Sequence, residues 1–376
     1  MKKMIAFNKP FTSNDDSKYI TAVLKNNKFA DGYYQKQCER IIRDKIRSRF
    51  VALTQNCTSA LEISMILINL KKGDEVIMPS YTFTSTANAV LLRGAKPVFA
   101  DVNFHDANLS YDSVKEKINK KTKAIVVVHY AGNSCDMKKF YALKKKYNLF
   151  LIEDCAHSFM GKFNNRFLGT IGDFGAFSFH ETKNLVGGQC GAISINNNAF
   201  VKRAKIILDK GTDRALIGNK KRYYSWKDIG SEFRSAELPA ALLYSQLIKF
   251  SNIDEKRKSI FETYEKKINL IKNKKFSIIK NNPKNKSAFH VFALIFKNIS
   301  IREKFINYMK KKNIFCFFHY YPLHISSFGK KFSRTQMKNT NKIYNGLVRL
   351  PLYPGLKRSE IIRVIKEVKN FNLIKT

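Results

Sequence analysis

The feature that most constrains this chain is the regular alternation of short apolar runs with amphipathic stretches between about residues 50 and 200. Runs such as Ala124–Tyr130 and Leu149–Glu153 are typical of buried strands. The stretches between them show helical spacing, as in Ser59–Leu70, where apolar residues recur on one face. Strands that alternate with helices in this way usually form a parallel sheet covered by helices. We therefore predict a large α/β unit over this part of the chain.

The predicted elements fall into two groups. In the first, the strands are expected at Phe50–Leu53, Glu75–Met78, Pro97–Asp101, Ala124–Tyr130, Leu149–Glu153, Ala176–Phe179 and Ala192–Ile195, and helices at Ser59–Leu70, Ser85–Leu92 and Met137–Tyr147. After about residue 235 the pattern changes to long helices with fewer strands. Helices are expected at Ala236–Phe250, Asp254–Ile271, Arg302–Lys312 and Ser359–Asn370, and a strand at His290–Phe296. This change predicts two domains: a large α/β domain with an N-terminal arm over residues 1–250, and a smaller α+β domain over 251–376.

Composition excludes several other classes of protein. Hydrophobic residues make up 44% of the 376 residues, which is too many for a mainly disordered chain. No apolar run has the length of a signal peptide or a membrane span. The six cysteines are scattered without a CxxC pair, which argues against a disulfide scaffold and against a cysteine zinc site. We expect a soluble, cytoplasmic protein.

The formal charge of +40 raises the possibility of nucleic-acid binding. Of the basic residues, 53 are Lys and 16 are Arg, whereas recognition of base edges favours Arg. No nucleic-acid-reading motif is present. We expect no specific nucleic-acid binding and no more than weak attraction to anionic surfaces, and a non-catalytic regulatory or nucleic-acid-binding role is kept as the alternative from a different class.

Three segments carry chemical groups at the ends of predicted elements. Asn56–Leu61 places small and hydroxyl residues where a helix begins, and a helix amino terminus favours an anion. Glu153–His157 places two carboxylates at the carboxyl end of a buried strand, where open α/β sheets bind ligands. Gly172–Asn184 contains a strand, then Lys183, and two glycines follow at Gly187–Gly188. Taken singly, the first could be an ordinary N-cap and the second a helix cap.

Together these segments match what pyridoxal phosphate (PLP) requires of a protein. Its aldehyde needs an amine with which to form a Schiff base, and Lys183 could supply it. Its pyridine nitrogen needs a carboxylate such as Asp154, which makes the ring an electron sink. Its phosphate needs a helix terminus with hydroxyls, which Thr58 and Ser178 could supply, and its ring needs an aromatic neighbour such as Phe83.

Longer stretches then identify a resemblance. The segments NCTSALE (56–62), GDEVIMPSYTFTSTANAVLLRGAKPVFADV (73–102), EDCAH (153–157) and FSFHETKN (177–184) resemble the DegT/DnrJ/EryC1/StrS family of sugar aminotransferases. Further similar stretches are VVHYAG (127–132), GTIGDFGAFSFHETKN (169–184), KGTDR (210–214), YSWKDIGSEF (224–233), FHYYPLH (318–324) and LPLY (350–353). The resemblance covers nearly the whole chain and is weakest over about 255–290. It implies the PLP-dependent aminotransferase fold of type I, with a large mixed sheet and a smaller C-terminal domain, in a homodimer whose active sites lie at the interface.

The resemblance also implies roles for particular residues. Lys183 matches the lysine of the Schiff base and Asp154 the partner of the pyridine nitrogen, so both are expected to be catalytic. The other residues implied to bind the cofactor are Phe83, His157, Cys57, Thr58 and Ser178. The residues implied to line the sugar-nucleotide pocket are Asn8 and Lys9 in the segment Phe7–Pro10, together with Tyr320 and His324. No metal is expected.

One position departs from the family pattern. Many relatives have a small polar residue near Gly230–Arg234 that reaches the partner subunit's phosphate, whereas this chain has Glu232. A carboxylate would be repelled by a phosphate, so either Glu232 turns away or Ser231 or Arg234 makes the contact. Pro239, where relatives usually have Gln, falls in the first turn of the next helix, where proline is tolerated.

The reaction implied is a two-stage transamination. L-Glutamate would convert the cofactor to its pyridoxamine form (PMP), which would then aminate a nucleotide-linked 4-keto-6-deoxyhexose. The likeness is greatest to members that form a dTDP-4-amino-4,6-dideoxygalactose, which indicates dTDP-4-keto-6-deoxy-D-glucose as the acceptor and surface-glycan synthesis as the purpose. A C3-acting aminotransferase is the nearest alternative. Related dehydratases carry a histidine in place of the lysine, so the presence of Lys183 favours transamination.

Overall fold

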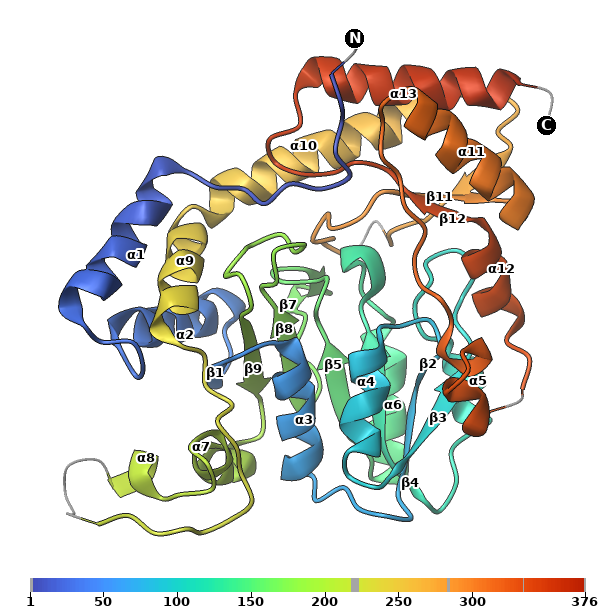
Figure 1. The fold of residues 1–376 in the computed structure, drawn as a ribbon. Coiled ribbons are helices and arrows are strands. Elements are labelled where there is room, and N and C mark those ends of the chain that lie inside the picture. The colour runs from blue at the N-terminus through green and yellow to red at the C-terminus, as the bar shows by residue number, and fades with distance from the viewer. Residues whose placement is uncertain (1–2, 218–222, 283–284, 334, 375–376) are drawn as a thin grey trace.

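Seven strands form the central sheet of the computed structural model, which describes residues 3–217, 223–282, 285–333 and 335–374. Their order is β1 (Phe50–Thr54), β9 (Gly191–Ile195), β8 (Phe174–Ser178), β5 (Phe150–Asp154), β4 (Thr122–Val128), β2 (Glu75–Pro79) and β3 (Lys96–Ala100) (Figure 1). The pairs from β8 to β3 are parallel, whereas β9 runs antiparallel to both of its neighbours. Residues 179–190 return the chain from β8 to β9 without a crossover helix, which makes this pair antiparallel.

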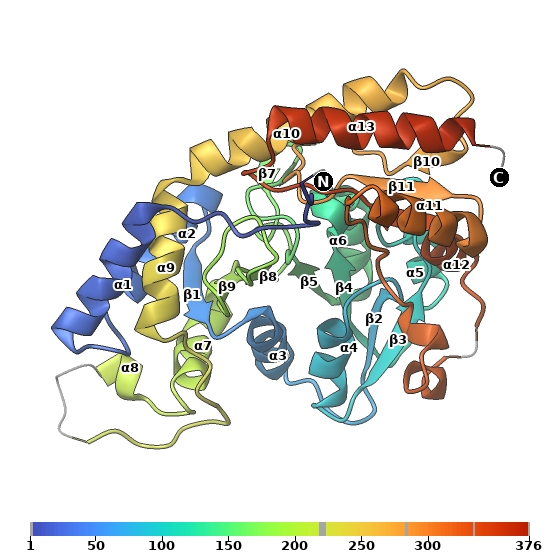
Figure 2. The same ribbon diagram turned by 45° about the horizontal axis from the view of Figure 1, so that its top comes forward.

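Helices cover both faces of the sheet because alternate residues of each strand are apolar and buried on opposite sides. One face packs against α2 (Tyr33–Ile46), α6 (Met137–Tyr147) and α9 (Glu237–Ile248). The other packs against α3 (Cys57–Leu67), α4 (Thr84–Leu91) and α7 (Val201–Leu208). In Figure 2, α3 and α4 lie side by side on this second face. The remaining elements before α9 are α1 (Asn14–Asn26), α5 (Tyr111–Lys115), β6 (Lys162–Phe163), β7 (Arg166–Phe167) and α8 (Arg214–Ile217).

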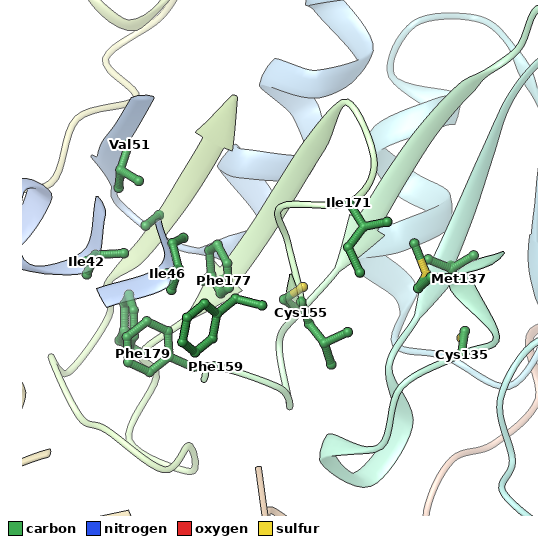
Figure 3. Packing of buried hydrophobic residues seen from close by; sticks show 14 of the residues in the cluster. Ile42, Ile46, Val51, Cys135, Met137, Cys155, Phe159, Ile171, Phe177 and Phe179 are labelled. Atoms are coloured by element: carbon green, nitrogen blue, oxygen red, sulfur yellow. The ribbon is translucent and has the colours of Figure 1, made fainter. Parts of the chain in front are cut away.

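Phenylalanine rings fill the first of these two layers. Phe159 contacts Phe177 and Phe179 with ring centroids 5.9 and 5.4 Å apart, and Ile42 and Ile46 of α2 lie near them (Figure 3). Each fully buried ring of this kind contributes about 1.5–3 kcal/mol. Because Phe177 and Phe179 flank Ser178, this packing also fixes the end of β8, where candidate site residues follow.

A smaller antiparallel sheet lies at the C-terminal side, in the order β10 (Phe276–Ile278), β11 (Ala293–Phe296) and β12 (Leu347–Arg349). It packs with α10 (Phe250–Asn269), α11 (Ile299–Lys311) and α13 (Arg358–Leu373), while α12 (Lys338–Gly346) precedes β12 (Figure 1). The N-terminal arm joins this half, since Ile5 forms a β-bridge with Ile314 and is fully buried there.

The predicted architecture is confirmed: the chain has a large mixed α/β sheet and the fold of the PLP-dependent aminotransferases of type I. The predicted helix bounds differ by a few residues, since the helices expected at Ala236–Phe250 and Asp254–Ile271 are α9 and a longer α10. The predicted division after residue 250 falls at the first residue of α10 and stays a prediction. None of the helices in the described ranges combines the length and apolar character that a membrane span needs.

Candidate active site

A cavity of about 720 Å³ lies where the carboxyl ends of the parallel strands meet the small sheet. The last residues of β4, β5 and β8, which are Val128, Asp154 and Ser178, line it from the large domain. From the C-terminal side it is lined by residues that include Tyr320 and Arg349. A concave site with few polar groups at this edge of an α/β sheet is the usual place for a ligand.

The amino terminus of α3 faces into this cavity. Asn56 caps the helix, and its side-chain oxygen accepts a hydrogen bond of 2.8 Å from the backbone N–H of Ser59. The first two helical residues, Cys57 and Thr58, line the cavity, and the Thr58 hydroxyl lies 2.7 Å from that of Ser85. A helix start with free N–H groups and adjacent hydroxyls suits a phosphate group.

Close packing beneath α3 completes this anion-binding end. Gly191 of β9 pairs with Ser178 of β8 in the sheet. A Cβ atom at Gly191 would lie 2.4 Å from the carbonyl carbon of Asn56, so only glycine allows β9 to approach the helix start so closely. Ser178, its partner in the sheet, lines the same cavity as Thr58.

Asp154 is a buried carboxylate with defined partners. Its Oδ2 accepts a hydrogen bond of 2.9 Å from the Thr86 hydroxyl, and its Oδ1 accepts one of 3.1 Å from the backbone N–H of Ala156. Burial raises the pKa of Asp154, while these hydrogen bonds and the charge of Lys183 oppose the rise. A carboxylate held in this way is suited to pair with a cationic N–H group of a ligand.

Lys183 follows β8 in a tight loop that is fixed by a hydrogen bond of 2.9 Å from its own N–H to the His180 carbonyl. Desolvation in the cavity, helped by the positive charge of Arg349 and opposed by Cys57 and Asp154, lowers the pKa of the Lys183 amine to about 8. The neutral form of the amine is therefore much more abundant near neutral pH than for an exposed lysine, which makes it able to act as a nucleophile and a base.

A group of neutral imidazoles lies beside the lysine. His157 Nε2 lies 3.1 Å from the Tyr320 hydroxyl, and the His157 ring packs against that of His290 with centroids 4.4 Å apart. Burial lowers the pKa values of His157, His290 and His319, so these rings are uncharged at neutral pH. His157 Nδ1 is buried and has no hydrogen-bond partner in the described part of the chain, which leaves it available to a ligand.

The structure brings most of the predicted site residues to this one cavity. The predicted residues that line it are Asn8, Cys57, Thr58, Phe83, Asp154, His157, Ser178, Lys183 and Tyr320. Phe83, at the N-cap of α4, is 59% exposed and lines the cavity. Lys9 is exposed and is not among the lining residues, and His324 is buried outside the cavity, where its Nδ1 lies 2.7 Å from the Ser80 hydroxyl.

The lining residues from the C-terminal side that the sequence analysis did not predict include His290, His319 and Arg349. His319 lies inside the segment FHYYPLH and Arg349 directly precedes LPLY, and both segments resemble the family. These positions were the signal in the sequence that could have identified the two residues. Another lining residue, Arg257, donates hydrogen bonds to the carbonyls of Phe289 and His290. Arg257 thus holds the backbone beside the imidazole group rather than presenting its charge to a ligand.

A buried pair, Glu153 and His129, stabilises the strand that carries Asp154. Glu153 accepts hydrogen bonds from the backbone N–H groups of Gly169, Ile171 and Gly172, and lies 3.0 Å from His129 Nε2. With Cys155 these two residues form a possible metal-ligating group. Because the carboxylate is already occupied by four donors, we interpret the group as a structural brace.

The side chain of Glu232 is turned toward a basic residue. It forms an ion pair with Lys210, and its backbone carbonyl accepts a hydrogen bond of 2.6 Å from Gln55. Arg234 lies 3.7 Å from Glu39. Pro239 lies in the first turn of α9, as expected. The Glu232 carboxylate is therefore paired with a cation of its own chain. That Ser231 or Arg234 contacts the partner subunit's phosphate stays a prediction.

Comparisons with known proteins agree with this geometry. The family described as "DegT/DnrJ/EryC1/StrS aminotransferase family" matches residues 10–369. The chain is 28% identical over 375 residues to the GDP-perosamine synthase of Escherichia coli O157:H7, covering 98% of this chain and 99% of that protein.

Two solved structures illustrate the likeness of fold. The aminotransferase TlmJ from Streptoalloteichus hindustanus is 25% identical and superposes with a TM-score of 0.91, covering 98% of this chain and 99% of that one. The PLP-form of Spr1654 from Streptococcus pneumoniae is 22% identical with a TM-score of 0.90, covering 98% and 99% of the two chains. The second likeness, at lower identity, concerns the fold alone.

Proposed function

The chain belongs to the DegT/DnrJ/EryC1/StrS aminotransferase family, and from that premise we propose that it transfers the amino group of L-glutamate to C4 of a dTDP-linked 4-keto-6-deoxyhexose. It is a PLP-dependent sugar aminotransferase. The observation that carries the proposal is the placement of Lys183, Asp154 and the start of α3 around one cavity. These three features supply the amine, the carboxylate and the phosphate site that this chemistry requires.

The cavity fits the cofactor. The start of α3 with Thr58, Ser178 and Ser85 would hold its phosphate, Asp154 its protonated ring nitrogen, and Lys183 its aldehyde carbon. His157, whose Nδ1 has no partner among the described residues, and the exposed ring of Phe83 would contact its ring. When bound, PLP supplies an electron sink that stabilises negative charge at the substrate carbon next to the nitrogen.

Lys183 performs the proton transfers in this proposal. Its neutral amine removes the α-proton of glutamate, which leaves as 2-oxoglutarate once its amino group has been given up. In the second stage, the same amine delivers a proton to C4 of the sugar as the amino group is attached there. The face of the sugar that meets Lys183 decides between the galacto and gluco products, and we propose the galacto product by resemblance.

The charge state of Lys183 makes a testable prediction about cofactor capture. Because the amine has a pKa of about 8, half of it is neutral at a pH of about 8, and the neutral form is nearly complete only about one pH unit higher. The initial rate of covalent PLP capture by the apoprotein should therefore rise with pH through about 8 and level off about one pH unit above that value. Borohydride trapping followed by mass spectrometry of the Lys183 peptide measures this rate. A rate that keeps rising toward pH 10 would contradict the desolvated environment of the amine.

We also propose a cytoplasmic homodimer with the active sites at the interface. All six cysteines are free, which fits a reducing compartment. Trp226 and Tyr224 are 82% and 61% exposed on a segment that precedes α9, and Phe83 of the cavity is also more than half exposed. Exposed aromatic side chains of this kind are typical of surfaces covered by a partner.

The acceptor is tested by product analysis. Purified protein with dTDP-4-keto-6-deoxyglucose and L-glutamate should yield a dTDP-4-amino-4,6-dideoxyhexose, whose mass shows amination and whose NMR coupling constants show the galacto configuration. The likeness to a GDP-perosamine synthase makes a GDP-linked sugar the second candidate. Turnover with GDP-4-keto-6-deoxymannose or a 3-keto sugar in place of the dTDP-4-keto sugar would overturn the proposed acceptor while leaving the aminotransferase chemistry in place.

A further inference from the structure

A second cavity, of about 590 Å³, lies at the opposite end of the strands from the candidate active site. Its lining includes Arg49 and Asp173, which directly precede β1 and β8, and Asn196, which directly follows the antiparallel strand β9. The candidate active site lies where β4, β5 and β8 end. Among the described residues, the two cavities share no lining side chain, so the second cavity is a separate site.

The second cavity carries more positive than negative charge. The basic residues that line it are Arg47, Arg49, Lys144 and Arg166. Its Asp173 carboxylate is already occupied, since it pairs with Lys144 and accepts a hydrogen bond of 2.9 Å from the backbone N–H of Leu151. None of the three arginines takes part in an ion pair within residues 3–217, 223–282, 285–333 and 335–374. Three cationic side chains therefore surround one cavity without an anion to pair with them.

The type of basic residue distinguishes this cavity from the general charge of the chain. Lysines outnumber arginines by 53 to 16 in the sequence, whereas three of the four basic residues in this lining are arginines. The guanidinium fork binds two oxygens of a phosphate at once and is less strongly hydrated than a lysine ammonium. A merely solvated surface of this lysine-rich chain would show the opposite ratio, so the lining indicates a site for a phosphorylated anion.

The backbone on one side of the cavity is held in place before any ligand binds. The Asn196 amide donates hydrogen bonds of 3.0 and 2.9 Å to the carbonyls of Gly169 and Gly172. Arg166 donates one of 2.7 Å from Nη2 to the Thr170 carbonyl, which orients its guanidinium. An anion would therefore meet a wall that is already formed, and little affinity would be lost in ordering this loop.

We propose that the second cavity binds a small diphosphate anion, either free or as part of a nucleotide. A diphosphate carries several negative charges and many acceptor oxygens, which match three arginine forks. The volume of the cavity lies in the range of small-molecule sites and leaves room for a nucleoside beside the diphosphate. This site is additional to the aminotransferase site and does not depend on which sugar is the acceptor.

Isothermal titration of the PLP-loaded enzyme with pyrophosphate at constant ionic strength tests this site. PLP is bound beforehand so that the phosphate site at the start of α3 is occupied. The double variant Arg47→Gln/Arg49→Gln should weaken pyrophosphate binding by at least about tenfold, because charge-assisted hydrogen bonds are lost. The double variant with Lys at both positions should weaken it less, since the charges stay and the forks are lost.

Two single variants serve as controls. Arg358→Gln removes an exposed arginine from the start of α13, so the pyrophosphate affinity should not change. Arg349→Gln removes a positive charge from the candidate active site and should also leave this affinity unchanged. The melting temperature of each unliganded variant, compared with that of the native protein, shows that it is folded.

Three results would overturn the proposal. The first is that the native enzyme does not bind pyrophosphate, or that the double Gln variant binds it as tightly. The second is an equal loss in Arg358→Gln, which would reveal only general attraction to a basic chain. The third is an equal loss in Arg349→Gln, which would place the anion in the active-site cavity.

ADP distinguishes the two sources of the diphosphate when it is titrated in the same way. Equal affinities for ADP and pyrophosphate, both lost in the double Gln variant, would support a site that binds the diphosphate alone. Tighter binding of ADP, lost in the same variant, would support a site that also contacts the nucleoside.

Discussion

Lys183→Ala is expected to abolish amino transfer and to remove covalent attachment of the cofactor. Two functions depend on this amine, since it bonds to the cofactor aldehyde and it moves the proton in both stages. Loss of a general acid–base group alone costs about 10²–10⁴-fold in rate. Both half-reactions should therefore fall below detection, the first in an assay of 2-oxoglutarate release and the second in an assay of the aminated sugar. Borohydride treatment should leave the mass of the peptide around residue 183 unchanged in the variant.

Two further variants test whether the reaction needs the neutral amine of Lys183 or only a positive charge. Lys183→Arg keeps a cation in the cavity but stays protonated, so it should be as inactive as the alanine variant. Lys304→Ala removes an exposed lysine from α11 and should behave as the native protein. Measurable turnover in Lys183→Arg would show that a neutral amine at this position is dispensable, and the mechanism would then be wrong.

The sequence was most informative where buried strands run through the centre of the sheet. The runs at Ala124–Tyr130 and Leu149–Glu153 are apolar because both of their faces are covered, and they coincide with β4 and β5. Helix ends were predicted less well: α3 begins at Cys57, directly after its cap Asn56, whereas the apolar spacing predicted a start at Ser59. The N-terminal helices α1 and α2 were not predicted at all.

The residues of the candidate site also differ in how well the sequence predicts them. The residues at strand ends, such as Asp154 and Ser178, could be predicted because their position follows from the topology of a parallel sheet. Arg349 could not, because one arginine among 69 basic residues carries no signal until the fold places it, half-buried, in the lining of the cavity. His290 was likewise placed at the start of a predicted strand, and only tertiary packing brings it to His157.

The second large effect is expected at Asp154. Asp154→Asn keeps the shape of the side chain but removes the negative charge that would hold the proton on the cofactor's ring nitrogen. A neutral ring nitrogen withdraws fewer electrons, so removal of the α-proton should slow by about 10²–10³-fold, similar to the loss of one preorganised electrostatic group. The affinity for PLP should fall as well. Stopped-flow measurement of the glutamate half-reaction and titration of the apoprotein with PLP give these two quantities.

The same substitution should leave the fold intact, and this separates function from stability. Burial raises the pKa of Asp154, which means that its charge is costly in the folded protein without ligand. The melting temperature of the Asp154→Asn apoprotein should therefore equal or exceed that of the native apoprotein. Thr86→Val removes one hydrogen bond to the carboxylate but keeps its charge, so its rate should fall less. A near-normal rate in Asp154→Asn would mean that another group holds the ring nitrogen.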